Sequence, residues 1–495
     1  MSTDTLMVIG ERHVPAVSGK LLEVINPATE QVECSVPDAG PEDVDNAVQA
    51  ARRAFDHGPW RLMTPWERGR LLYQLSDLIE HHADEVAMLD TRDMGMPYLH
   101  SRRHDLPGVV DLLRFYAGYA DKMRGSEIPC GPDKHVFAIR EPVGVVACIL
   151  PWNFPLATAA QKLAPALACG NTVVMKPAEQ SPRSAARLAE LCLEAGFPAG
   201  VVNTVTGRGE TAGAQLAGHR GVDKISFTGS TAVGRLIMKA AAEHIHKVTL
   251  ELGGKNAFIV FADAPLEAAV SYSATTLCYN SGQVCTSGSR VLLDRGVHDE
   301  FLERLTGVLS GFKVGNPLQP DTKLGPLVSR EQFDKVTGYI TSAAQRYSPV
   351  SCGHRSEPLK QGYYVDPTIF DHVDSGEAIT QEEIFGPVLS VIDFKDEQEA
   401  IEIASQTSYG LATSIWTRDI SRAHRLARQV DTGFAWINCS NFWTAAIPYE
   451  GHRASGIGVD MGLEVIESYT KLKSVIVDLT ARPHPWAELS KGTDL

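Results

Sequence analysis

Two short segments of the chain carry the side chains most suited to covalent chemistry. Cys285 stands in Asn280-Ser-Gly-Gln-Val-Cys-Thr286, and Glu251 stands in Thr249-Leu-Glu-Leu-Gly-Gly-Lys-Asn256. A thiol attacks a carbonyl carbon well only as the thiolate, and a nearby carboxylate can manage protons for that attack or for a later water. If the two side chains meet in space, they predict an enzyme that forms and breaks a thioester.

The surroundings of Cys285 distinguish it from the other cysteines. Most free cysteines are small buried hydrophobic residues, and Cys148 and Cys169 lie in apolar runs where that role is expected. Cys285 has small and polar neighbours, among them Gly282 and Thr286, which let a backbone amide approach a ligand and leave the sulfur accessible. The chain has nine cysteines in all: Cys34, Cys130, Cys148, Cys169, Cys192, Cys278, Cys285, Cys352 and Cys439.

The composition excludes several classes of protein. With 495 residues the chain is long enough for more than one domain, and its 44% hydrophobic and 21% charged residues are ordinary for a folded soluble protein. A net charge of −14 disfavours nucleic-acid and anionic-membrane partners. An odd cysteine count without C-x-x-C spacing favours a reducing compartment and no metal site. Because no signal-peptide pattern or membrane-length apolar run is present, we expect a cytoplasmic protein.

Short apolar runs alternate with helical patterns, which predicts an α/β fold with parallel sheets. Helices are expected over 41–55, from Thr64-Pro65 onward, over 156–168, from Ser181-Pro182 to Gly196, and from Gly229 to about His244. A first series of strands, in the style of a dinucleotide-binding domain, is expected at 143–150, 171–175, 201–205 and 223–227. A second series begins at 258–260 and includes 276–284, 290–293, 389–393, 412–416 and 434–438.

Two segments fall outside these series. Residues 126–141 contain a Pro- and Gly-rich turn before an apolar run, which predicts a protruding hairpin. Residues 473–479 form a strand pattern with no successor in order. We expect the two to pair with each other, and their exposed edge could pair with another subunit. The segment 481–495 is rich in proline and charge and is expected to be a surface tail.

Glycine and charged residues at strand ends indicate where a nucleotide would bind. Gly207-Arg-Gly-Glu-Thr-Ala-Gly213 departs from the dinucleotide fingerprint by one residue and favours an ordinary turn. Gly229 and Ser230 instead follow a strand and open a helix, which would place free amides against a diphosphate. Lys176 and Glu179 end another strand and suit an adenosine ribose. Because a carboxylate would repel a 2′-phosphate, this favours NAD over NADP.

A series of short motifs runs through nearly the whole chain in a fixed order. They are Val24-Ile-Asn-Pro-Ala-Thr29, Pro151-Trp-Asn-Phe-Pro155, Lys176-Pro-Ala-Glu179, Phe227-Thr-Gly-Ser230, Glu251-Leu-Gly-Gly254, Gly282-Gln-Val-Cys285, Gly315-Asn-Pro317, Glu382-Glu-Ile-Phe-Gly-Pro387 and Ser455-Gly-Ile-Gly458. In this order and spacing the chain resembles the aldehyde dehydrogenase superfamily, in its NAD-dependent, hydrolytic form.

The resemblance implies a role for each matching residue. Cys285 would be the nucleophile, Glu251 the general base and Asn153 the side-chain donor of the oxyanion hole. The aldehyde would pass through a thiohemiacetal and a thioester on Cys285, and water activated by Glu251 would release the acid. The residues implied to bind NAD are Lys176, Glu179, Gly229, Ser230, Trp152, Phe385 and Glu383, the last at the nicotinamide ribose.

The resemblance also implies an arrangement of domains and subunits. A Rossmann-like NAD-binding domain would comprise residues 1–122 and 143–253, and an α/β catalytic domain bearing the thiol would comprise 254–455. A small β oligomerisation element would comprise 123–142 and 470–495. The expected assembly is a homodimer or homotetramer whose partner molecules are a small aldehyde and NAD.

The substrate channel is where the chain departs from the family pattern. Pro448-Tyr-Glu-Gly places Glu450 where glycine is usual, and this charge is expected near the channel mouth. Aromatic side chains in the channel favour a hydrophobic or aromatic aldehyde, although a betaine- or aminoaldehyde remains the alternative because rings can surround a cation. The residues expected to line the channel are Phe154, Ala157, Thr158, Gln161, Tyr279, Val284, Thr286, Asn441, Trp443 and Tyr449.

Two further functions stay open beside hydrolytic oxidation. A CoA-acylating semialdehyde dehydrogenase would transfer the acyl group to coenzyme A, and such relatives commonly lack the base that Glu251 supplies. A non-catalytic relative would keep the fold alone, although stability does not require Cys285, Glu251 and Asn153 together.

Overall fold

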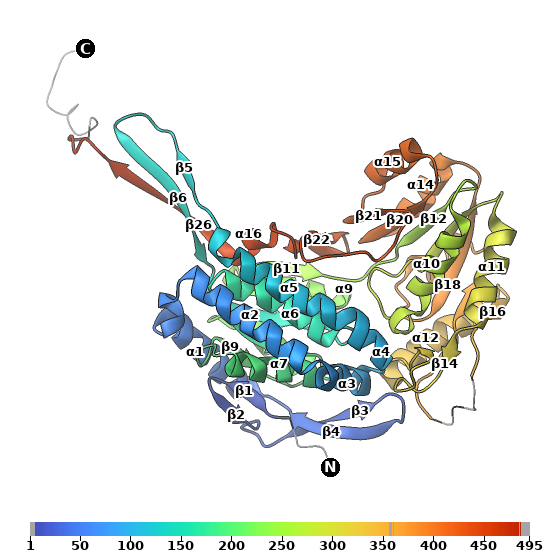
Figure 1. Ribbon diagram of the computed structural model, residues 1–495, viewed down its shortest axis with the longest axis horizontal. Helices are drawn as coiled ribbons and strands as arrows, with labels where there is room; N and C mark the ends of the chain where they lie inside the picture. The colour runs from blue at the N-terminus through green and yellow to red at the C-terminus, as the bar shows by residue number, and fades with distance from the viewer. Residues whose placement is uncertain (1–4, 356–358, 360, 485, 487–495) are drawn as a thin grey trace.

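A mostly parallel sheet of eight strands forms the centre of the first of two lobes (Figure 1). The computed structural model describes residues 5–355, 359, 361–484 and 486. The sheet has the order β2 (Arg12–Val14), β1 (Met7–Ile9), β9 (Val202–Thr204), β8 (Thr172–Lys176), β7 (Val145–Ile149), β10 (Lys224–Thr228), β11 (Lys247–Glu251) and β24 (Gly456–Ile457). Strands β7 and β8 are fully buried apolar runs, as expected for parallel strands covered on both faces.

The direction of chain progress reverses between two neighbouring strands of this sheet. From β7 the chain steps to β8 and β9 on one side, whereas β10 lies on the other side of β7 and is followed outward by β11. Open α/β sheets bind ligands outside the carboxyl ends of the strands at such a reversal point. Residues 151–153 leave the end of β7 there, and residues 229–230 leave the end of β10.

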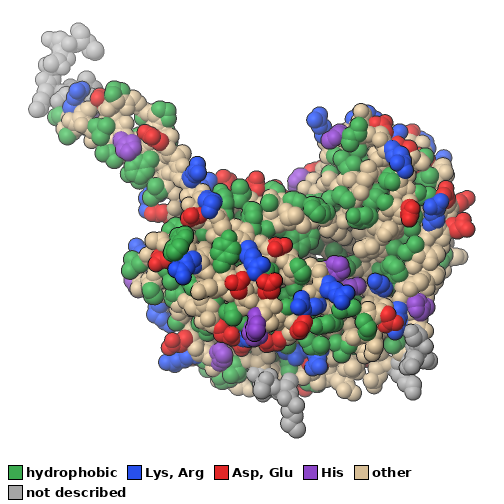
Figure 2. Space-filling model, viewed as in Figure 1, with side chains coloured by type: hydrophobic (Ala, Val, Ile, Leu, Met, Phe, Trp, Pro, Cys, Tyr) green, Lys and Arg blue, Asp and Glu red, His purple; other side chains and the backbone are tan. Residues whose placement is uncertain are grey.

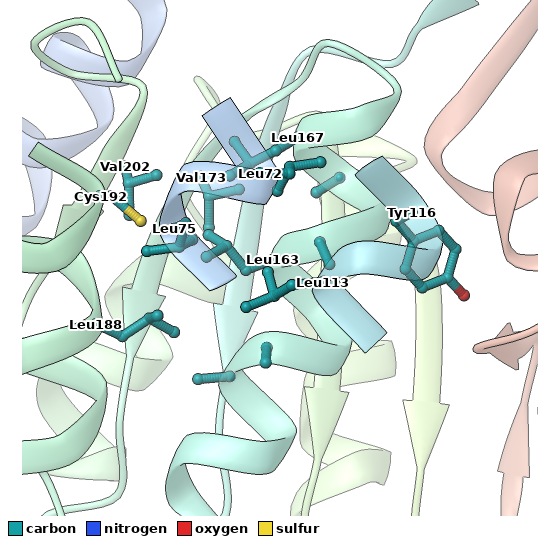
Figure 3. Close-up of a cluster of buried hydrophobic side chains, with 14 of the residues drawn as sticks. Leu72, Leu75, Leu113, Tyr116, Leu163, Leu167, Val173, Leu188, Cys192 and Val202 are labelled. Atoms are coloured by element: carbon teal, nitrogen blue, oxygen red, sulfur yellow. The ribbon is translucent and has the colours of Figure 1, made fainter. Parts of the chain in front are cut away.

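Helices cover both faces of the first sheet. One face is packed by α2 (Pro65–His81), α5 (Leu106–Tyr119), α6 (Pro155–Ala168) and α7 (Arg183–Glu194), and the other by α1 (Pro41–Asp56), α8 (Ala214–Ala217) and α9 (Thr231–His244). Figure 3 shows part of the first cluster, in which Leu72, Leu75, Leu113, Tyr116, Leu163, Leu167, Val173, Leu188, Cys192 and Val202 come from the helices and the strands beneath them. This double layer fixes the carboxyl edge of the sheet.

The second lobe contains a seven-stranded sheet. Its order is β16 (Pro349–Ser351), β17 (Thr368–Phe370), β18 (Val388–Phe394), β13 (Arg290–Asp294), β12 (Ala257–Val260), β20 (Ala412–Trp416) and β21 (Phe434–Ile437). Helices α10 (Leu266–Cys278) and α11 (His298–Ser310) pack on one face, and α14 (Glu397–Ser405) and α15 (Ile420–Gln429) pack on the other. The segment 276–284 was expected in the strand series, but it forms the end of α10 and a 3-10 turn.

An arm of three antiparallel strands projects from the first lobe (Figure 1). It has the order β26 (Thr470–Asp478), β6 (Lys134–Pro142) and β5 (Ser126–Ile128). The predicted pairing of the two orphan segments is confirmed, because β26 pairs with β6 from Thr470 opposite Pro142 to Asp478 opposite Lys134. The end of the expected tail, 487–495 with residue 485, lies outside the described residues.

Shorter elements complete the described fold. They are β3 (Leu21–Asn26), β4 (Gln31–Pro37), α3 (Ala83–Met94), α4 (Tyr98–His100), β14 (Lys313–Val314), β15 (Thr322–Leu324), α12 (Arg330–Ala343), α13 (Ala378–Gln381), β19 (Tyr409–Gly410), β22 (Tyr449–Glu450), β23 (His452–Arg453), β25 (Val459–Asp460) and α16 (Val465–Tyr469), with single turns at Pro59–Leu62, Ser101–Asp105, Ala120–Lys122, Gly209–Gly213 and Tyr279–Gly282.

The α/β fold class and most predicted elements are confirmed. Thr64 caps α2 as expected, because its hydroxyl accepts from the Glu67 amide while the Glu67 carboxylate accepts from the Thr64 amide. Ser181 does not cap α7, since its hydroxyl donates instead to the Trp152 carbonyl. The domain boundaries stay a prediction. Among the described residues, no helix is both long and apolar enough to cross a membrane.

Candidate active site

A single cavity of about 940 Å³ brings the predicted catalytic side chains together. Cys285, Glu251 and Asn153 all line it, although they come from three separate parts of the chain. The surface is hollowed between the two lobes (Figure 2). Asn153 follows β7 and Glu251 ends β11 on the first sheet, while Cys285 lies just before β13 of the second. The site therefore depends on the packing of one lobe against the other.

The turn before Cys285 has an unusual backbone. Asn280 and Ser281 have φ of 49° and 55°, and Gly282 follows with φ of 75°, so three successive residues are left-handed. A Cβ at Gly282 would lie 2.4 Å from the carbonyl carbon and oxygen of Gly386. Only glycine fits this position, because both the conformation and the space exclude a side chain. The turn reverses the chain after α10 and presents Cys285 to the cavity.

Two buried amide side chains hold the cysteine loop. Asn256 Nδ2 donates to the carbonyls of Cys285 (2.8 Å) and Ser287 (2.9 Å), and its Oδ1 accepts from the Ala412 amide (3.0 Å). Gln283 Oε1 accepts from the backbone amide of residue 328 at 2.9 Å, and its Nε2 donates to the carbonyl of residue 280 at 3.1 Å. Buried amides that satisfy all these groups fix the loop in one conformation.

The sulfur of Cys285 has a hydrogen-bond partner from a distant part of the chain. Its Sγ lies 3.1 Å from the hydroxyl of Tyr449. Burial raises the pKa of the Cys285 thiol to about 11, and the carboxyls of Glu383 and Glu251 act in the same direction. The hydrogen bond from Tyr449 and a backbone hydrogen bond at Thr286 lower it. These opposing effects decide how much thiolate is present.

Glu251 is a buried carboxyl group at the end of β11. Its side chain has 5% relative exposure, and neither carboxyl oxygen has a hydrogen-bond partner among the described residues. Burial raises its pKa well above the usual value, Asp460 and Glu450 raise it further, and Lys162 opposes them. A carboxyl group whose oxygens are not hydrogen-bonded to protein can hold and move a proton at the cavity wall.

Asn153 is fixed against the loop that carries the cysteine. Its Nδ2 donates to the Gln283 carbonyl at 2.9 Å, and its own carbonyl accepts from Asn280 Nδ2 at 2.9 Å. An amide NH₂ has two hydrogens, so one remains to donate into the cavity. The arrangement places an oriented donor beside Cys285.

Several predicted cofactor residues line the same cavity. Gly229 and Ser230 do so at the N-terminus of α9, where Ser230 caps the helix by accepting from the Val233 amide. The first-turn amides and the positive end of the helix dipole suit a phosphate there. Trp152 and Phe385 meet edge to face with ring centroids 5.2 Å apart.

Glu383 lies against the two glycines that follow Glu251. Its Oε1 accepts from the Gly254 amide at 3.0 Å, and a Cβ at Gly253 would lie 2.3 Å from its Oε2. Burial raises the pKa of the Glu383 carboxyl, while the Gly254 hydrogen bond, Lys335 and the neighbouring lysine at 255 oppose that shift. Gly253 thus leaves room for this carboxylate, while a Cβ at Gly254 would lie 2.6 Å from the Cys285 carbonyl oxygen.

Lys176 and Glu179 lie together at the end of β8, outside the residues that line the cavity. Lys176 Nζ is 3.0 Å from Glu179 Oε2. Burial raises the pKa of the Glu179 carboxyl, but Lys176 and the backbone amide of Gly209 more than offset this and hold it below the usual value. The carboxylate is partly exposed, with 35% of its side chain accessible, so it is charged and reachable by a ligand.

Each predicted channel residue lines the cavity. These are Phe154, Ala157, Thr158, Gln161, Tyr279, Val284, Thr286, Asn441, Trp443 and Tyr449. Phe154 and Tyr279 stack with centroids 6.3 Å apart. Glu450 does not itself line the cavity, but it follows the lining residue Tyr449, is half-buried in β22 opposite Val459, and raises the pKa of Glu251; its expected place near the mouth stays a prediction.

One wall of the channel was missed by the sequence reasoning. The segment from α4 to α5 contributes His100, His104, Asp105, Gly108 and Asp111. Asp105 accepts from the Tyr279 hydroxyl at 2.5 Å, and burial raises the pKa of this carboxyl to about 7. A Cβ at Gly108 would lie 2.8 Å from the Trp443 ring, so the glycine makes room for the indole. The sequence signal that could have indicated this wall is Asp111, a charged residue within the largely apolar helix α5.

A group of potential metal ligands lies outside the cavity, since none of its members lines it. It contains His298, Asp371 and His372, with Asp393 close by. The two imidazole rings stack with centroids 4.6 Å apart and an interplanar angle of 14°. His298 Nε2 is hydrogen-bonded to Asp371 at 2.9 Å. Burial lowers the pKa of His298, but its hydrogen bonds to Asp299 and Asp371 more than offset this, which favours an ion-paired His298.

Comparison with known protein families gives one match that spans most of the chain. The model of the aldehyde dehydrogenase family matches residues 13–475. A mitochondrial aldehyde dehydrogenase of Rattus norvegicus is 46% identical over 464 residues, which cover 93% of this chain and 89% of that protein. Aldehyde dehydrogenase family 2 member B4, mitochondrial, of Arabidopsis thaliana is 42% identical over 476 residues, which cover 96% and 88%.

Solved structures show the same similarity in three dimensions. The NAD+ complex of an aldehyde dehydrogenase from Bacillus cereus has a TM-score of 0.94 and 43% identity, and the match covers 97% of each chain. A mutant of the indole-3-acetaldehyde dehydrogenase AldA from P. syringae, in complex with NAD+ and IAA, has a TM-score of 0.94 and 41% identity, again over 97% of each chain.

Proposed function

Because the chain belongs to the aldehyde dehydrogenase family and is an NAD-dependent aldehyde dehydrogenase, we propose that it oxidises its substrate through a covalent adduct on Cys285 that water hydrolyses. One observation carries the proposal: a sulfur nucleophile, an amide donor and a buried carboxyl group line one cavity. The roles below are assigned to Cys285, Asn153 and Glu251 on that geometry.

The residues around the cavity fit NAD. The amino end of α9 at Gly229 and Ser230 would hold the diphosphate, and the charged Glu179, with Lys176, would hold the adenosine ribose. Trp152, Phe385 and Glu383 would lie on the nicotinamide side, with Glu383 at its ribose. When bound, NAD accepts the hydride that the substrate carbon gives up.

The first chemical step forms a bond between Cys285 and the carbonyl carbon. The Cys285 thiolate attacks, and the carbonyl oxygen becomes an oxyanion held by the free Asn153 amide hydrogen and the Cys285 backbone N–H. Asn153 needs no reorganisation, because its other hydrogen is already fixed on the Gln283 carbonyl. Loss of hydride from the adduct leaves a thioester on the sulfur.

The second step releases the acid. Ionised Glu251 accepts a proton from water, which attacks the thioester carbon, and the Cys285 sulfur leaves as thiolate. Because the pKa of Glu251 is raised above its usual range, hydrolysis should speed up as pH rises through that value. Glu251 is buried and Cys285 is half-buried, so few other waters can reach the intermediate.

Hydrophobic or aromatic aldehydes are the proposed substrates. Phe154, Tyr279, Trp443 and Tyr449 supply apolar walls. A relative of 41% identity is an indole-3-acetaldehyde dehydrogenase, which agrees with this class. An aminoaldehyde is the second candidate, because the carboxyl group of Asp111 also lines the cavity and could pair with a cation.

The test begins with two substitutions and a substrate panel. Cys285→Ala should abolish NADH formation while NAD still binds by fluorescence titration, and retained turnover would refute the covalent route. Glu251→Gln should give a burst of NADH followed by slow turnover. If the progress curve of this variant is linear and has the wild-type rate, the base role is refuted. Release of free acid without coenzyme A separates hydrolysis from CoA acylation.

The panel compares kcat/KM for phenylacetaldehyde, hexanal and 4-aminobutyraldehyde. The proposal expects the first two to be preferred. A preference for the cationic aldehyde that falls in Asp111→Asn would establish the second candidate instead.

The proposed oligomeric state and cellular location of the protein are supported by separate observations. The arm exposes Leu472 (64%) and Ile476 (67%), so we propose that it pairs with a second subunit in a homodimer or homotetramer. Light scattering after size exclusion would show a monomer if this is wrong. The odd number of cysteines and the lack of C-x-x-C spacing support a reducing, cytoplasmic location.

A further inference from the structure

Tyr449 contacts the reactive sulfur although it lies far from Cys285 in the sequence. It lies in β22, and its hydroxyl is 3.1 Å from Cys285 Sγ across a separation of 164 residues. Its ring packs edge to face on Phe434, with centroids 4.8 Å apart, and Phe434 stacks in turn on Trp436 at 5.1 Å. The aromatic cluster holds the ring, so the hydroxyl is aimed at the sulfur.

We propose that Tyr449 is a catalytic residue: its hydroxyl donates a hydrogen bond to Cys285 Sγ, which stabilises the thiolate and directs it toward the substrate channel. The inference rests on the proposed role of Cys285 as nucleophile. It goes beyond the lining role expected of an aromatic residue, because a phenylalanine would line the channel equally well.

The balance of charges around the sulfur supports this assignment. Glu383 and Glu251 both disfavour a thiolate, and burial disfavours it more strongly. Against them act the Tyr449 hydroxyl and the backbone hydrogen bond at Thr286. Removing one of two stabilising hydrogen bonds in a buried site should therefore have a measurable effect.

The direction of the hydrogen bond follows from the surroundings of the tyrosine. Burial raises the pKa of the Tyr449 hydroxyl well above its usual value, and the neighbouring Cys285 and Glu251 add to that shift. The raised pKa favours the protonated hydroxyl, which is the form that can donate to the thiolate. Because a thiolate carries no proton, the Tyr449 hydroxyl is the donor once Cys285 is ionised.

The hydroxyl can be removed without disturbing the packing. Tyr449→Phe deletes one oxygen and keeps the ring against Phe434. The matched control is Tyr116→Phe, which removes a buried hydroxyl that donates to the Gly462 carbonyl at 2.9 Å. A general effect of losing a buried tyrosine hydroxyl would appear in both variants, whereas an effect on the sulfur would appear only in the first.

The experiment measures the sulfur directly. Alkylation of Cys285 by iodoacetamide is followed by mass spectrometry across pH in the full-length protein. In Tyr449→Phe the rate at pH 7.5 should fall about tenfold and the midpoint should move up by about one pH unit, as expected for a hydrogen bond to a charged group. In steady-state kinetics, Tyr449→Phe should lower kcat by a larger factor than the factor by which it changes KM for the aldehyde.

The outcomes are distinct. A wild-type alkylation profile in Tyr449→Phe overturns the inference, and so does an equal shift in Tyr116→Phe. Because alkylation reports thiolate and requires no turnover, this failure differs from failure of the proposed function, which appears as activity retained in Cys285→Ala.

Discussion

Replacing Asn256 should loosen the loop that carries the nucleophile. Its side chain makes three hydrogen bonds, to the carbonyls of Cys285 and Ser287 and from the Ala412 amide, at 2.8, 2.9 and 3.0 Å. Asn256→Ala leaves these buried groups without their partner. At about 1–1.5 kcal/mol for each bond, the expected loss of stability is about 3–4.5 kcal/mol. The rate of Cys285 alkylation and kcat should change with it.

A control with the same bonding pattern exists in the other lobe. Asn171 is buried, donates to the carbonyls of Ala166 and Tyr469 at 3.0 Å each, and accepts from the Gly144 amide at 2.9 Å. Asn171→Ala should therefore lower the midpoint of thermal unfolding by a similar amount. Since Asn171 does not touch the cysteine loop, the alkylation kinetics of the folded protein should stay as in the wild type.

The variant Asn256→Asp tests the same contacts through the direction in which its stability changes with pH. A carboxylate facing two carbonyls is destabilised, so its folded pKa is raised above the unfolded value. Stability from the protonated form is then present at low pH and lost as pH rises through the folded pKa. The midpoint of thermal unfolding of this variant, measured relative to the wild type, should be lower at pH 8 than at pH 5. Equal midpoint differences at both pH values, or wild-type alkylation in Asn256→Ala, would refute the reasoning.

Three further predictions concern the turn, the channel and the base. Gly282→Ala should abolish activity and lower the thermal midpoint, because φ is 75° and the new Cβ would lie 2.4 Å from a backbone carbonyl; an active, stable variant would contradict this. Gly108→Ala should push Trp443 into the channel and lower kcat/KM for aromatic more than for small aldehydes, whereas an equal effect on both would argue against a steric wall. Glu450→Gln should lower the pKa of Glu251, so the acid limit of thioester hydrolysis should move to lower pH in a pH–rate profile.

Local patterns predicted most of the framework. The strands β7 and β8 were recognisable because parallel strands covered on both faces are continuous apolar runs, and α2 was recognisable because Thr64 and Glu67 form a capping box. The α/β class, the family and NAD were predicted in the same way and are confirmed. Each strand, cap and motif is a signal within a short stretch of sequence, and the family followed from the order of these motifs along the chain.

Contacts between distant segments could not be predicted from such patterns. The wall that contains Asp105 reaches Tyr279 across 174 residues, and no spacing rule links the two. Ser181 resembled a helix cap, but a carbonyl of another loop competes for its hydroxyl. The pairing of Glu450 with Val459 in β22 and β25 joins two very short strands, which no local pattern of the sequence predicts.

The pairing of β6 with β26 has a consequence for how the chain is made. These strands are separated by more than three hundred residues, since Pro142 lies opposite Thr470. While a ribosome is still producing the segments between them, β6 has an open edge, and β24 has not yet completed the first sheet. A chain released before residue 470 would keep that edge exposed and should aggregate rather than fold. The edge of β6 can therefore be covered within the chain only after the last strand has been synthesised.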